Sequence, residues 1–487
     1  MPLLPDPAMS LHQLSLKLTA QLDQFIANAP ADRGPTVRLA PMREIAEHLD
    51  LEQGTERGLG VEGVTDFLQG YLSYATRLHG EAFFAHQTAP PNPGSTAAAL
   101  IDGCVSNPMA IFEMGPAAAT IEYWLVNHLL QLVGWQPPPW PEQREHSEPC
   151  AAGVLVHGGS VGTLTALVAA RTRVQADVWE RGNDPRLCLV CAEGAHYAVQ
   201  RAAGIMGLGR KQIVHAATDD RGALTAEGVE RTLSQLREQQ RMPIAVIATG
   251  CSTSVGAFDP LDQIAQVCAR FGVWLHVDAA HGGAVLISDT LRHRLHGIDL
   301  ADSVVWDAHK MMRTGPLCTA VLFRDERACN AAFEQEASYL FHDKQLPGFD
   351  FLHRTIECTK AALGLKWYLA LAWEGEAAVA RYIERCFELT HYAWQLIETD
   401  PQFASALEPE ANILCFRRRD GEGNELDTRD ELINEGRFHL STTLFAGKRW
   451  LRIVVMSPAT SERVIDQLLD RLRPPSANAS TPNRDPG

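Results

Sequence analysis

The pattern of hydrophobic and polar positions changes along the chain. Over about the first 75 residues, apolar residues recur at helical spacing, as in LHQLSLKLTAQLDQFIA (11–27) and GVTDFLQGYLSYATRL (63–78), which predicts an N-terminal layer of helices. The proline-rich stretch TAPPNPGS (88–95) interrupts this pattern. The segment 116–135 then predicts a long amphipathic helix, because it opens on a proline and ends at a glycine.

Short apolar runs alternate with helical patterns in the middle of the chain. Near-continuous apolar strands between helices are typical of a sheet that is covered on both faces. The sequence therefore predicts an α/β core with a mostly parallel central sheet. The expected strands cover residues 186–193, 244–250, 273–280, 302–308 and 318–324.

A second helical pattern starts near residue 358 and leads to a smaller α+β pattern. Strands are expected there at NILCFRR (412–418) and RWLRIVVMS (449–457). The final residues are rich in Pro, Ser and Asn, which is typical of disorder. We therefore expect an N-terminal helical segment (1–90), a large α/β domain (91–374), a small C-terminal α+β domain (375–473) and a disordered tail (474–487).

Composition and charge limit the kinds of molecule that this chain is expected to bind. The chain has 487 residues, of which 46% are hydrophobic, so it can bury a large core. Its formal net charge is −16 and its Lys and Arg residues are scattered, which argues against a nucleic-acid partner and against a basic membrane-binding face. No apolar run approaches the roughly 18 residues that span a bilayer, and the start MPLLPDPAMSLHQL lacks the pattern of a secretory signal. These features predict a cytoplasmic protein without a membrane partner.

The 11 cysteines, from Cys104 to Cys415, show no spacing typical of metal ligands. They are interpreted as reduced thiols in a reducing compartment. Cys188 and Cys191 form a C-x-x-C pair inside a predicted strand, without a second pair of Cys or His nearby, so a redox or zinc role is disfavoured. We expect no metal site.

Polar residues that end apolar strands are the first candidates for a site, because ligands of open α/β sheets bind beyond the carboxyl ends of the strands. The run GVLV is followed by HGGSVG and a helical pattern. Gly158, Gly159, Ser160 and Gly162 allow close approach of the backbone, and free N–H groups at a helix start favour an anion such as phosphate. The stretch matches neither a P-loop nor a complete G-x-G-x-x-G motif, so a structural turn explains it equally well.

Three further strand ends carry polar groups. Asp278 follows an apolar run, where a buried carboxylate needs a proton donor or a cation, or caps the next helix. Lys310, after His309, is either a desolvated Schiff-base nucleophile or a surface lysine whose amine reaches solvent. His196 either stacks on a planar ligand or caps the helix that follows. A phosphate cup, a carboxylate, a flat heterocycle and a strand-end lysine together match the needs of pyridoxal phosphate.

The same stretches resemble a known family, the group II pyridoxal-phosphate-dependent amino acid decarboxylases, which include glutamate, cysteine sulfinate and aromatic amino acid decarboxylases. The resemblance covers about residues 80–460, and HVDAA (276–280) followed by DAHK (307–310) is a specific combination. It implies an aspartate aminotransferase-like α/β fold (fold type I), pyridoxal 5'-phosphate as cofactor, an amino acid as substrate and a homodimer with the active site at the interface. The other stretches that carry it are MGPAAATIEYWLVNHLLQLVGW, HGGSVGTLTALVAAR, GAHYAVQRAAGIMGLG, ATGCSTSVGAFDPLDQIA and LRIVVMSPA.

The resemblance implies roles for single residues. Lys310 would hold the cofactor as a Schiff base, and Asp278 would pair with the protonated pyridine nitrogen and make the ring an electron sink. His196 would stack on the ring face. The other implied cofactor contacts are Gly159, Ser160 and His309 at the phosphate, Thr253 near the far edge of the ring and Ala280 beneath it.

Substrate-binding residues are implied as well. Arg452 aligns with an arginine that binds a substrate carboxylate in the family, and the fork of a guanidinium can make two hydrogen bonds to a carboxylate. A salt bridge at a strand edge is the alternative for Arg452. His86 and Gln87 lie in a segment that reaches into the substrate pocket in the family, which makes them candidates for specificity.

Two departures from the family pattern bear on the chemistry. In the glutamate-type enzymes a mobile loop carries a tyrosine thought to protonate the substrate carbon after CO₂ loss. The matching stretch 337–360 is two residues shorter and places Phe349 there, so His342 or His353 would have to donate the proton, or aldehyde or transamination products would form. Asp307 stands where many relatives have Asn, and we expect its carboxylate to turn away from the phosphate or to form a local hydrogen bond.

The sequence therefore predicts a pyridoxal-phosphate-dependent carboxy-lyase that converts an L-amino acid to an amine and CO₂. The loop pattern YLF…DK…IEC favours an acidic substrate such as glutamate, aspartate or cysteine sulfinate, with diamino and aromatic amino acids as alternatives. An alternative of another class is a weakly catalytic paralogue that binds the cofactor and acts through assembly. The joint presence of Lys310, Asp278 and His196 argues against it.

Overall fold

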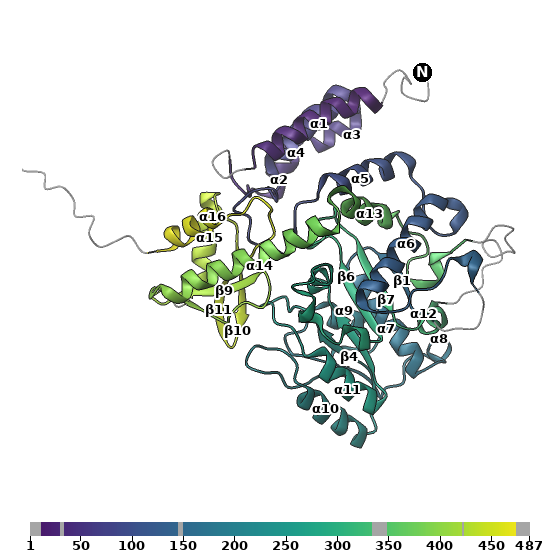
Figure 1. The fold of residues 1–487 in the computed structure, drawn as a ribbon. Coiled ribbons are helices and arrows are strands. Elements are labelled where there is room, and N and C mark those ends of the chain that lie inside the picture. Colours follow the sequence, from purple (N-terminus) through teal and green to yellow (C-terminus); the bar gives the residue numbers. More distant parts are fainter. Residues whose placement is uncertain (1–10, 30–33, 145–149, 334–347, 421–422, 474–487) are drawn as a thin grey trace, which may run out of the picture. The chain divides into compact units, whose positions relative to one another are not determined.

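The structure, a computed structural model, describes residues 11–29, 34–144, 150–333, 348–420 and 423–473. The main sheet within these ranges has seven strands (Figure 1). In order across the sheet they are β1 (Ala152–Val156), β7 (Thr319–Phe323), β6 (Ser303–Asp307), β5 (Trp274–Asp278), β4 (Met242–Thr249), β2 (Leu187–Cys191) and β3 (Ile213–His215). Neighbours from β3 to β6 pair in parallel, whereas β7 pairs antiparallel with both β6 and β1. The mostly parallel α/β core is confirmed.

Apolar runs account for the burial of these strands. Every residue of β1, β2, β5, β6 and β7 is buried, as expected for a sheet that helices cover on both faces. All five runs that were predicted as strands form strands. The list of expected strands omitted β1, although its run GVLV was noted, and β3, which has three residues and is partly exposed, so that it lacks an apolar run.

Helices pack against this sheet, and α7 (Gly159–Val174) contacts β4, β5, β6 and β7. Gly162 permits the close approach, because a Cβ atom there would lie 3.2 Å from Cγ2 of both Thr319 and Val321. The other α-helices of this region are α5 (Pro93–Val105), α6 (Pro116–Val133), α8 (Val178–Arg181), α9 (Ala198–Ile205), α10 (Ala226–Glu238), α11 (Leu261–Phe271) and α12 (Glu326–Phe333). Short 3-10 helices lie at Phe112–Met114, Pro141–Gln143, Arg210–Gln212, Gly282–Ile287, Arg292–Leu295, Ile298–Leu300 and Phe351–Arg354.

The helical pattern that begins near residue 358 forms two helices, α13 (Leu363–Glu374) and α14 (Glu376–Thr399). Gly375 separates them with a φ of 79°, a left-handed conformation that favours glycine. The prediction of one helical run is therefore wrong in its first residues and at Gly375. Periodicity alone did not show this break, because the apolar spacing resumes directly after the glycine.

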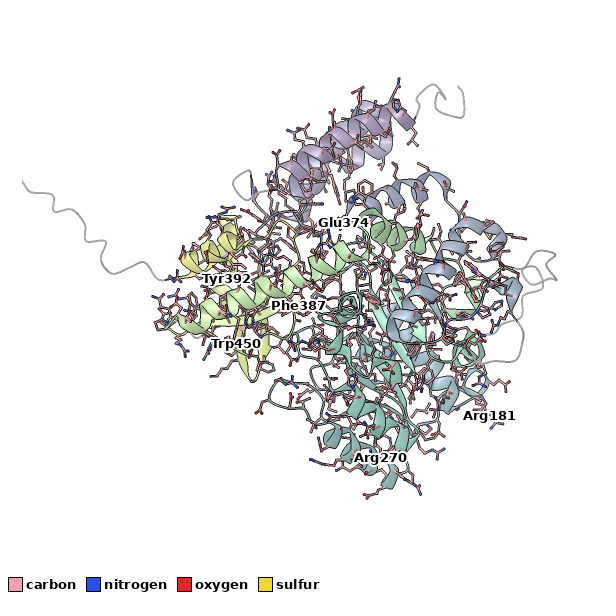
Figure 2. All side chains as sticks on the ribbon, viewed as in Figure 1. Arg181, Arg270, Glu374, Phe387, Tyr392 and Trp450 are labelled. Atoms are coloured by element: carbon pink, nitrogen blue, oxygen red, sulfur yellow. The ribbon has the colours of Figure 1, made fainter. Side chains whose placement is uncertain are left out.

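The C-terminal residues form a second, four-stranded sheet. Its order is β10 (Ser441–Phe445), β11 (Lys448–Val454), β9 (Ile413–Arg418) and β8 (Phe403–Ser405), with α15 (Glu425–Glu435) and α16 (Glu462–Leu472) in the same part of the chain. The guanidinium of Arg417 lies 5.0 Å from the ring centroid of Trp450, which Figure 2 labels. The N-terminal helices are α1 (Leu11–Ala27), α2 (Met42–His48), α3 (Leu51–Arg57) and α4 (Gly60–Tyr74).

The chain divides into two compact units. The larger unit comprises Gln87–Glu388 with Leu407–Ile413, and the smaller unit comprises Met1–His86, Leu389–Ala406 and Leu414–Gly487. The four segments proposed from the sequence stay a prediction. Among the described residues, no helix is both long and apolar enough to cross a bilayer.

Candidate active site

A cavity of about 430 Å³ lies in the larger unit, at the carboxyl ends of the sheet strands. Its walls come from the segments that follow β1, β2, β4, β5 and β6. This is the place where open α/β sheets bind ligands. The residues singled out by the strand-end argument lie at this cavity.

The cavity brings together every residue that was predicted to contact the cofactor. These residues are Gly159, Ser160, His196, Thr253, Asp278, Ala280, His309 and Lys310. Further lining residues, which the sequence analysis did not propose as contacts, include His157, Tyr197, Arg201, Cys251, Ser252 and His281. Most of these lie within a few residues of a predicted one, so their position next to a strand end was the available signal.

Lys310 lies three residues beyond the end of β6, and its side chain is 17% exposed. Its Nζ atom is 3.2 Å from Oδ2 of Asp307, while Oδ1 of Asp307 accepts a hydrogen bond of 2.6 Å from the Thr319 hydroxyl. Asp307 thus forms the local hydrogen bond expected from the sequence. Its carboxylate also faces Gly159, where a Cβ atom would lie 2.9 Å from Oδ2, so a side chain at position 159 would collide with it.

His309 is held by the backbone of the neighbouring strand segment. Its Nδ1 lies 3.0 Å from the carbonyl oxygen of Cys318, to which it can donate a hydrogen bond. Nε2 then lies 3.8 Å from Oδ2 of Asp307. The ring is therefore fixed at the cavity wall beside the start of α7.

Asp278 ends β5 between the parallel strands β4 and β6. The residue is 9% exposed, and its Oδ1 accepts a hydrogen bond of 3.1 Å from the N–H of Ala280. A carboxylate in this setting can accept a further hydrogen bond from a protonated heterocycle in the cavity.

His196 lies between β2 and α9. Its Nδ1 accepts a hydrogen bond of 3.2 Å from the N–H of Ala198, and its ring centroid is 4.1 Å from that of Tyr197. The helix-start contact considered for His196 therefore exists, and the same ring also lines the cavity. Burial lowers the pKa of His196, so a neutral, flat imidazole is expected at neutral pH.

The start of α7 provides a place for an anion. Its N-cap residue is Gly158, with a φ of 104°, and no side chain caps the helix. The first N–H groups of a helix lack intrahelical partners and carry the positive end of the helix dipole, so they bind anions well. This anion site lies at the same cavity as the Asp278 carboxylate, the His196 ring and the Lys310 amine. The residues present therefore fit pyridoxal phosphate.

The loop candidates for a proton donor lie elsewhere or cannot be placed. His342 is outside the described residues. The ring of Phe349 packs 5.4 Å from that of Tyr123 and 4.8 Å from that of Phe351. Neither Phe349 nor His353 is among the described residues that line the cavity. The identity of the proton donor stays a prediction.

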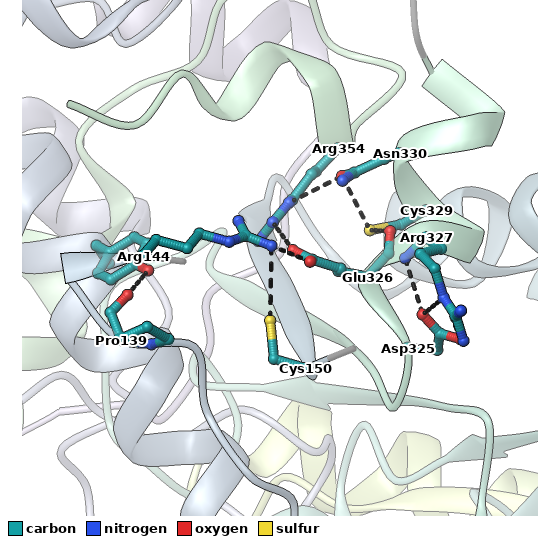
Figure 3. Close-up of polar contacts among 10 residues, drawn as sticks. Pro139, Arg144, Cys150, Asp325, Glu326, Arg327, Cys329, Asn330 and Arg354 are labelled. Carbon is teal, nitrogen blue, oxygen red and sulfur yellow. Dashed lines mark hydrogen bonds and ion pairs between the residues drawn. The ribbon is translucent and has the colours of Figure 1, made fainter. Parts of the chain in front are cut away.

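A polar cluster fixes the segment around Phe349 (Figure 3). The guanidinium of Arg354 lies 4.3 Å from the Phe349 ring centroid and donates hydrogen bonds to Glu326 Oε2 at 3.1 Å and to Asn330 Oδ1 at 3.2 Å. Arg144 also donates to Glu326. Because Glu326 and Asn330 belong to α12, the cluster ties residues 348–354 to that helix.

The predicted substrate residues are not among those that line the cavity. Arg452, on β11 of the smaller unit, is 6% exposed, and its Nη1 donates to the Ala85 carbonyl at 3.4 Å and to the Ser441 hydroxyl at 3.2 Å. His86 follows Ala85, and its ring lies 5.7 Å from that of His439. Gln87 belongs to the larger unit. Arg452 and His86 thus form part of one local cluster, whose role stays a prediction.

Comparison with known proteins identifies relatives of this chain. A family model described as the pyridoxal-dependent decarboxylase conserved domain matches residues 66–419, which is more than half of the chain. Acidic amino acid decarboxylase GADL1 of Mus musculus is 30% identical over 453 residues, which cover 89% of this chain and 80% of that protein. Cysteine sulfinic acid decarboxylase of Rattus norvegicus is 32% identical over 381 residues, which cover 77% of this chain and 74% of that protein.

Solved structures show the same relationship. The crystal structure of mouse CSAD has a TM-score of 0.86 at 27% identity and covers 95% of this chain and 98% of that one. The structure of Oryza sativa TDC with PLP and tryptamine has a TM-score of 0.84 at 20% identity, covering 96% and 98%. At that identity the second likeness is one of fold alone.

Proposed function

Because the chain belongs to the pyridoxal-dependent decarboxylase family and is an amino acid decarboxylase that uses pyridoxal 5'-phosphate, we propose that its substrate is an acidic L-amino acid. Glutamate, aspartate and cysteine sulfinate are the candidates, and an amine and CO₂ are the products. The observation that carries this proposal is the 30–32% identity to an acidic amino acid decarboxylase and a cysteine sulfinic acid decarboxylase over at least 77% of the chain.

In this proposal, Lys310 and Asp278 are the two residues that bind the reactive groups of the cofactor. Pyridoxal phosphate, when bound, supplies an electron sink for the electrons that remain when CO₂ leaves. Lys310 would hold the cofactor covalently through its amine. Asp278 accepts a hydrogen bond from the pyridine N–H and so keeps that nitrogen protonated.

The other cavity residues orient the cofactor. The N–H groups at the start of α7, with Ser160 and His309, bind the phosphate. The neutral ring of His196 would stack on the pyridine ring, and Thr253 and Ala280 would be further contacts of the cofactor. Contacts at several points would fix the orientation of the cofactor in the cavity, which is an effect of positioning.

Arg452 is the proposed recognition group for the acidic side chain of the substrate. A guanidinium that is 6% exposed retains its charge and offers a planar fork for a carboxylate or a sulfinate. His86 and Gln87 are proposed as further contacts. Arg452→Gln should raise KM for the acidic substrate by about 10- to 100-fold and change the affinity for the cofactor by less than about 2-fold.

We also propose that the protein is a homodimer. Leu100, Ile101 and Val105 of α5 are 52%, 44% and 57% exposed, and Trp124 of α6 is 44% exposed. Exposed apolar side chains gathered on helices are typical of interaction surfaces. Light scattering coupled to size-exclusion chromatography tests this, and a monomeric mass would contradict it.

The decisive experiment is a panel of L-amino acids assayed with the purified holoenzyme for CO₂, amine, aldehyde and ammonia. The proposal expects equal amounts of amine and CO₂ from an acidic substrate and at least about 100-fold lower kcat/KM for aromatic and diamino acids. Turnover of those acids in preference to glutamate, aspartate and cysteine sulfinate would contradict it. The sequence between residues 340 and 367 contains no tyrosine, which is why aldehyde and ammonia are measured as well: their formation would support the alternative products.

A further inference from the structure

His157 is a cavity residue that the preceding roles leave unused. It lies between β1 and the glycines at the start of α7, and it lines the cavity. Its Nδ1 lies 2.5 Å from Oε1 of Glu357, a residue 200 positions later in the chain. The ring is thus oriented by a carboxylate from a separate segment.

The second ring nitrogen of His157 remains available. Among the described residues no hydrogen-bond partner of its Nε2 is found, and the side chain is 37% exposed. Oε2 of Glu357 is buried and likewise has no partner in the described part of the chain. Since Nδ1–H donates to Glu357, a second proton on the ring would make Nε2–H a charged donor.

The neighbouring corner of the cavity holds a carboxylate next to the proposed phosphate position. The carboxylate of Asp307 lies directly behind Gly159, and a phosphate held by the start of α7 would be repelled by it. Lys310 lies 3.2 Å from this carboxylate, but in the proposed function its amine is bound to the cofactor. His309 points one nitrogen to a carbonyl and the other toward Asp307.

We infer that His157, positioned by Glu357, is a further cofactor-binding residue whose Nε2–H donates to the phosphate of pyridoxal phosphate and offsets the negative charge of Asp307. Its place in the chain, directly before Gly158 and Gly159, puts it at the phosphate end of the cavity. Glu357 acts through His157 and is a positioning residue. The inference rests on the cofactor of the family and does not depend on which acid is the substrate.

The test compares two ligands that differ by the phosphate. Holoenzyme is diluted into buffer without cofactor, and the release of pyridoxal phosphate is followed by its visible absorption. Protein stripped of cofactor is then titrated with pyridoxal phosphate and with pyridoxal. For His157→Gln we expect the Kd for pyridoxal phosphate to rise about 10-fold and that for pyridoxal to change by less than about 2-fold. His157→Asn is the second variant, should the first fail to fold by circular dichroism.

Glu357→Gln should raise the Kd for pyridoxal phosphate about 3-fold. In the His157→Gln background it should not raise this Kd further, a result that a merely structural role of Glu357 would not produce. His128→Gln is the matched control, because His128 Nε2 lies 2.5 Å from Glu376 Oε1 and is not among the described cavity residues. It should leave both affinities unchanged.

Three results would overturn the inference. Equal weakening of both ligands would indicate a loss of structure, and an unchanged Kd for pyridoxal phosphate with a raised KM would indicate a contact to substrate. If Arg201→Gln loses affinity for pyridoxal phosphate and His157→Gln does not, the positive charge that faces the phosphate belongs to Arg201, which also lines the cavity. If the wild-type protein itself binds no pyridoxal phosphate, the proposed function fails, which is a distinct outcome.

Discussion

Two lysine–carboxylate pairs in the larger unit have similar chemistry and different surroundings. Lys310 pairs with Asp307 at the cavity, where the lysine side chain is 17% exposed. Lys360 pairs with Glu122 in the interior, where the two side chains are 1% and 0% exposed. The Lys360 amine also lies 5.1 Å from the ring centroid of Phe351, and Glu122 accepts the N–H of Leu155 at 3.0 Å.

If Lys310 has the role proposed above, the free space beside an amine, rather than its partner, separates a reactive lysine from a structural one. Burial raises the pKa of Glu122, and the Lys360 ammonium opposes this shift. Because both side chains are shielded from solvent, we interpret that pair as joining the segment before α13 to α6 and β1. Lys310 has a cavity of about 430 Å³ in front of it, so its amine can exchange its ion pair for a covalent bond to the cofactor.

Among the substitutions that test this contrast, we expect Lys310→Ala to have the largest effect on kcat. Loss of the covalent attachment should lower kcat by roughly 10³-fold or more. Decarboxylation kinetics and reduction of the holoenzyme with borohydride, followed by mass spectrometry, measure this. Retention of a borohydride-fixed cofactor in the variant would show that another lysine carries it.

The next effect concerns the Asp278 carboxylate at the end of β5. Asp278→Ala should leave much of the cofactor binding intact and lower kcat by roughly 10²- to 10³-fold, because the ring nitrogen loses the charge that keeps it protonated. Titration with pyridoxal phosphate and steady-state kinetics separate the two effects. An undiminished rate would refute the role of Asp278.

The sequence could single out the lysine of one pair but not the lysine of the other, and it predicted neither pairing. Lys310 follows a buried apolar run, so a charged group at a strand end was visible in the one-dimensional pattern. Lys360 lies in a segment that was assigned to a helix, and its partner Glu122 is 238 residues away in the chain. Periodicity reports local structure and contains no information on such pairings.

The same limit applies to the rest of the fold and the site. Most strands with apolar runs were predicted, whereas β3 lacks such a run and Gly375 breaks a helical pattern without changing its spacing. His157 and Glu357 are ordinary polar residues until the fold brings them within 2.5 Å. Candidate residues at the end of a strand could be singled out from the sequence, and residues that are held by a distant partner could not.

Lys360→Met should mainly affect stability. The change leaves the Glu122 carboxylate buried and unpaired, which costs about 3–5 kcal/mol of unfolding free energy. The variant Lys360→Met with Glu122→Gln should recover much of that loss, since no charge is then buried alone while the Leu155 N–H keeps an acceptor. Denaturant unfolding measures this, and kcat per folded molecule should stay within about 3-fold of the wild type. A stable variant with lost activity would contradict the contrast between the two lysines.

The smallest effect tests a buried titratable group on β5, two residues before Asp278. Burial lowers the pKa of His276 to about 4, with the Asp278 charge opposing the shift; its Nδ1 lies 2.8 Å from the Ser303 hydroxyl. Between about pH 6.5 and pH 4 the unfolded chain binds a proton that the folded chain does not, so this group's contribution is full above that window and is lost as the pH falls through it. Between pH 7.5 and pH 5 the wild type should therefore lose about 2 kcal/mol more unfolding free energy than His276→Gln. The two proteins share every other titrating group, so the contributions of those groups cancel in the comparison. One of them is the opposite contribution of Asp259, whose pKa burial raises to about 6. Equal pH slopes of the unfolding free energy for the two proteins would show that His276 is protonated in the fold.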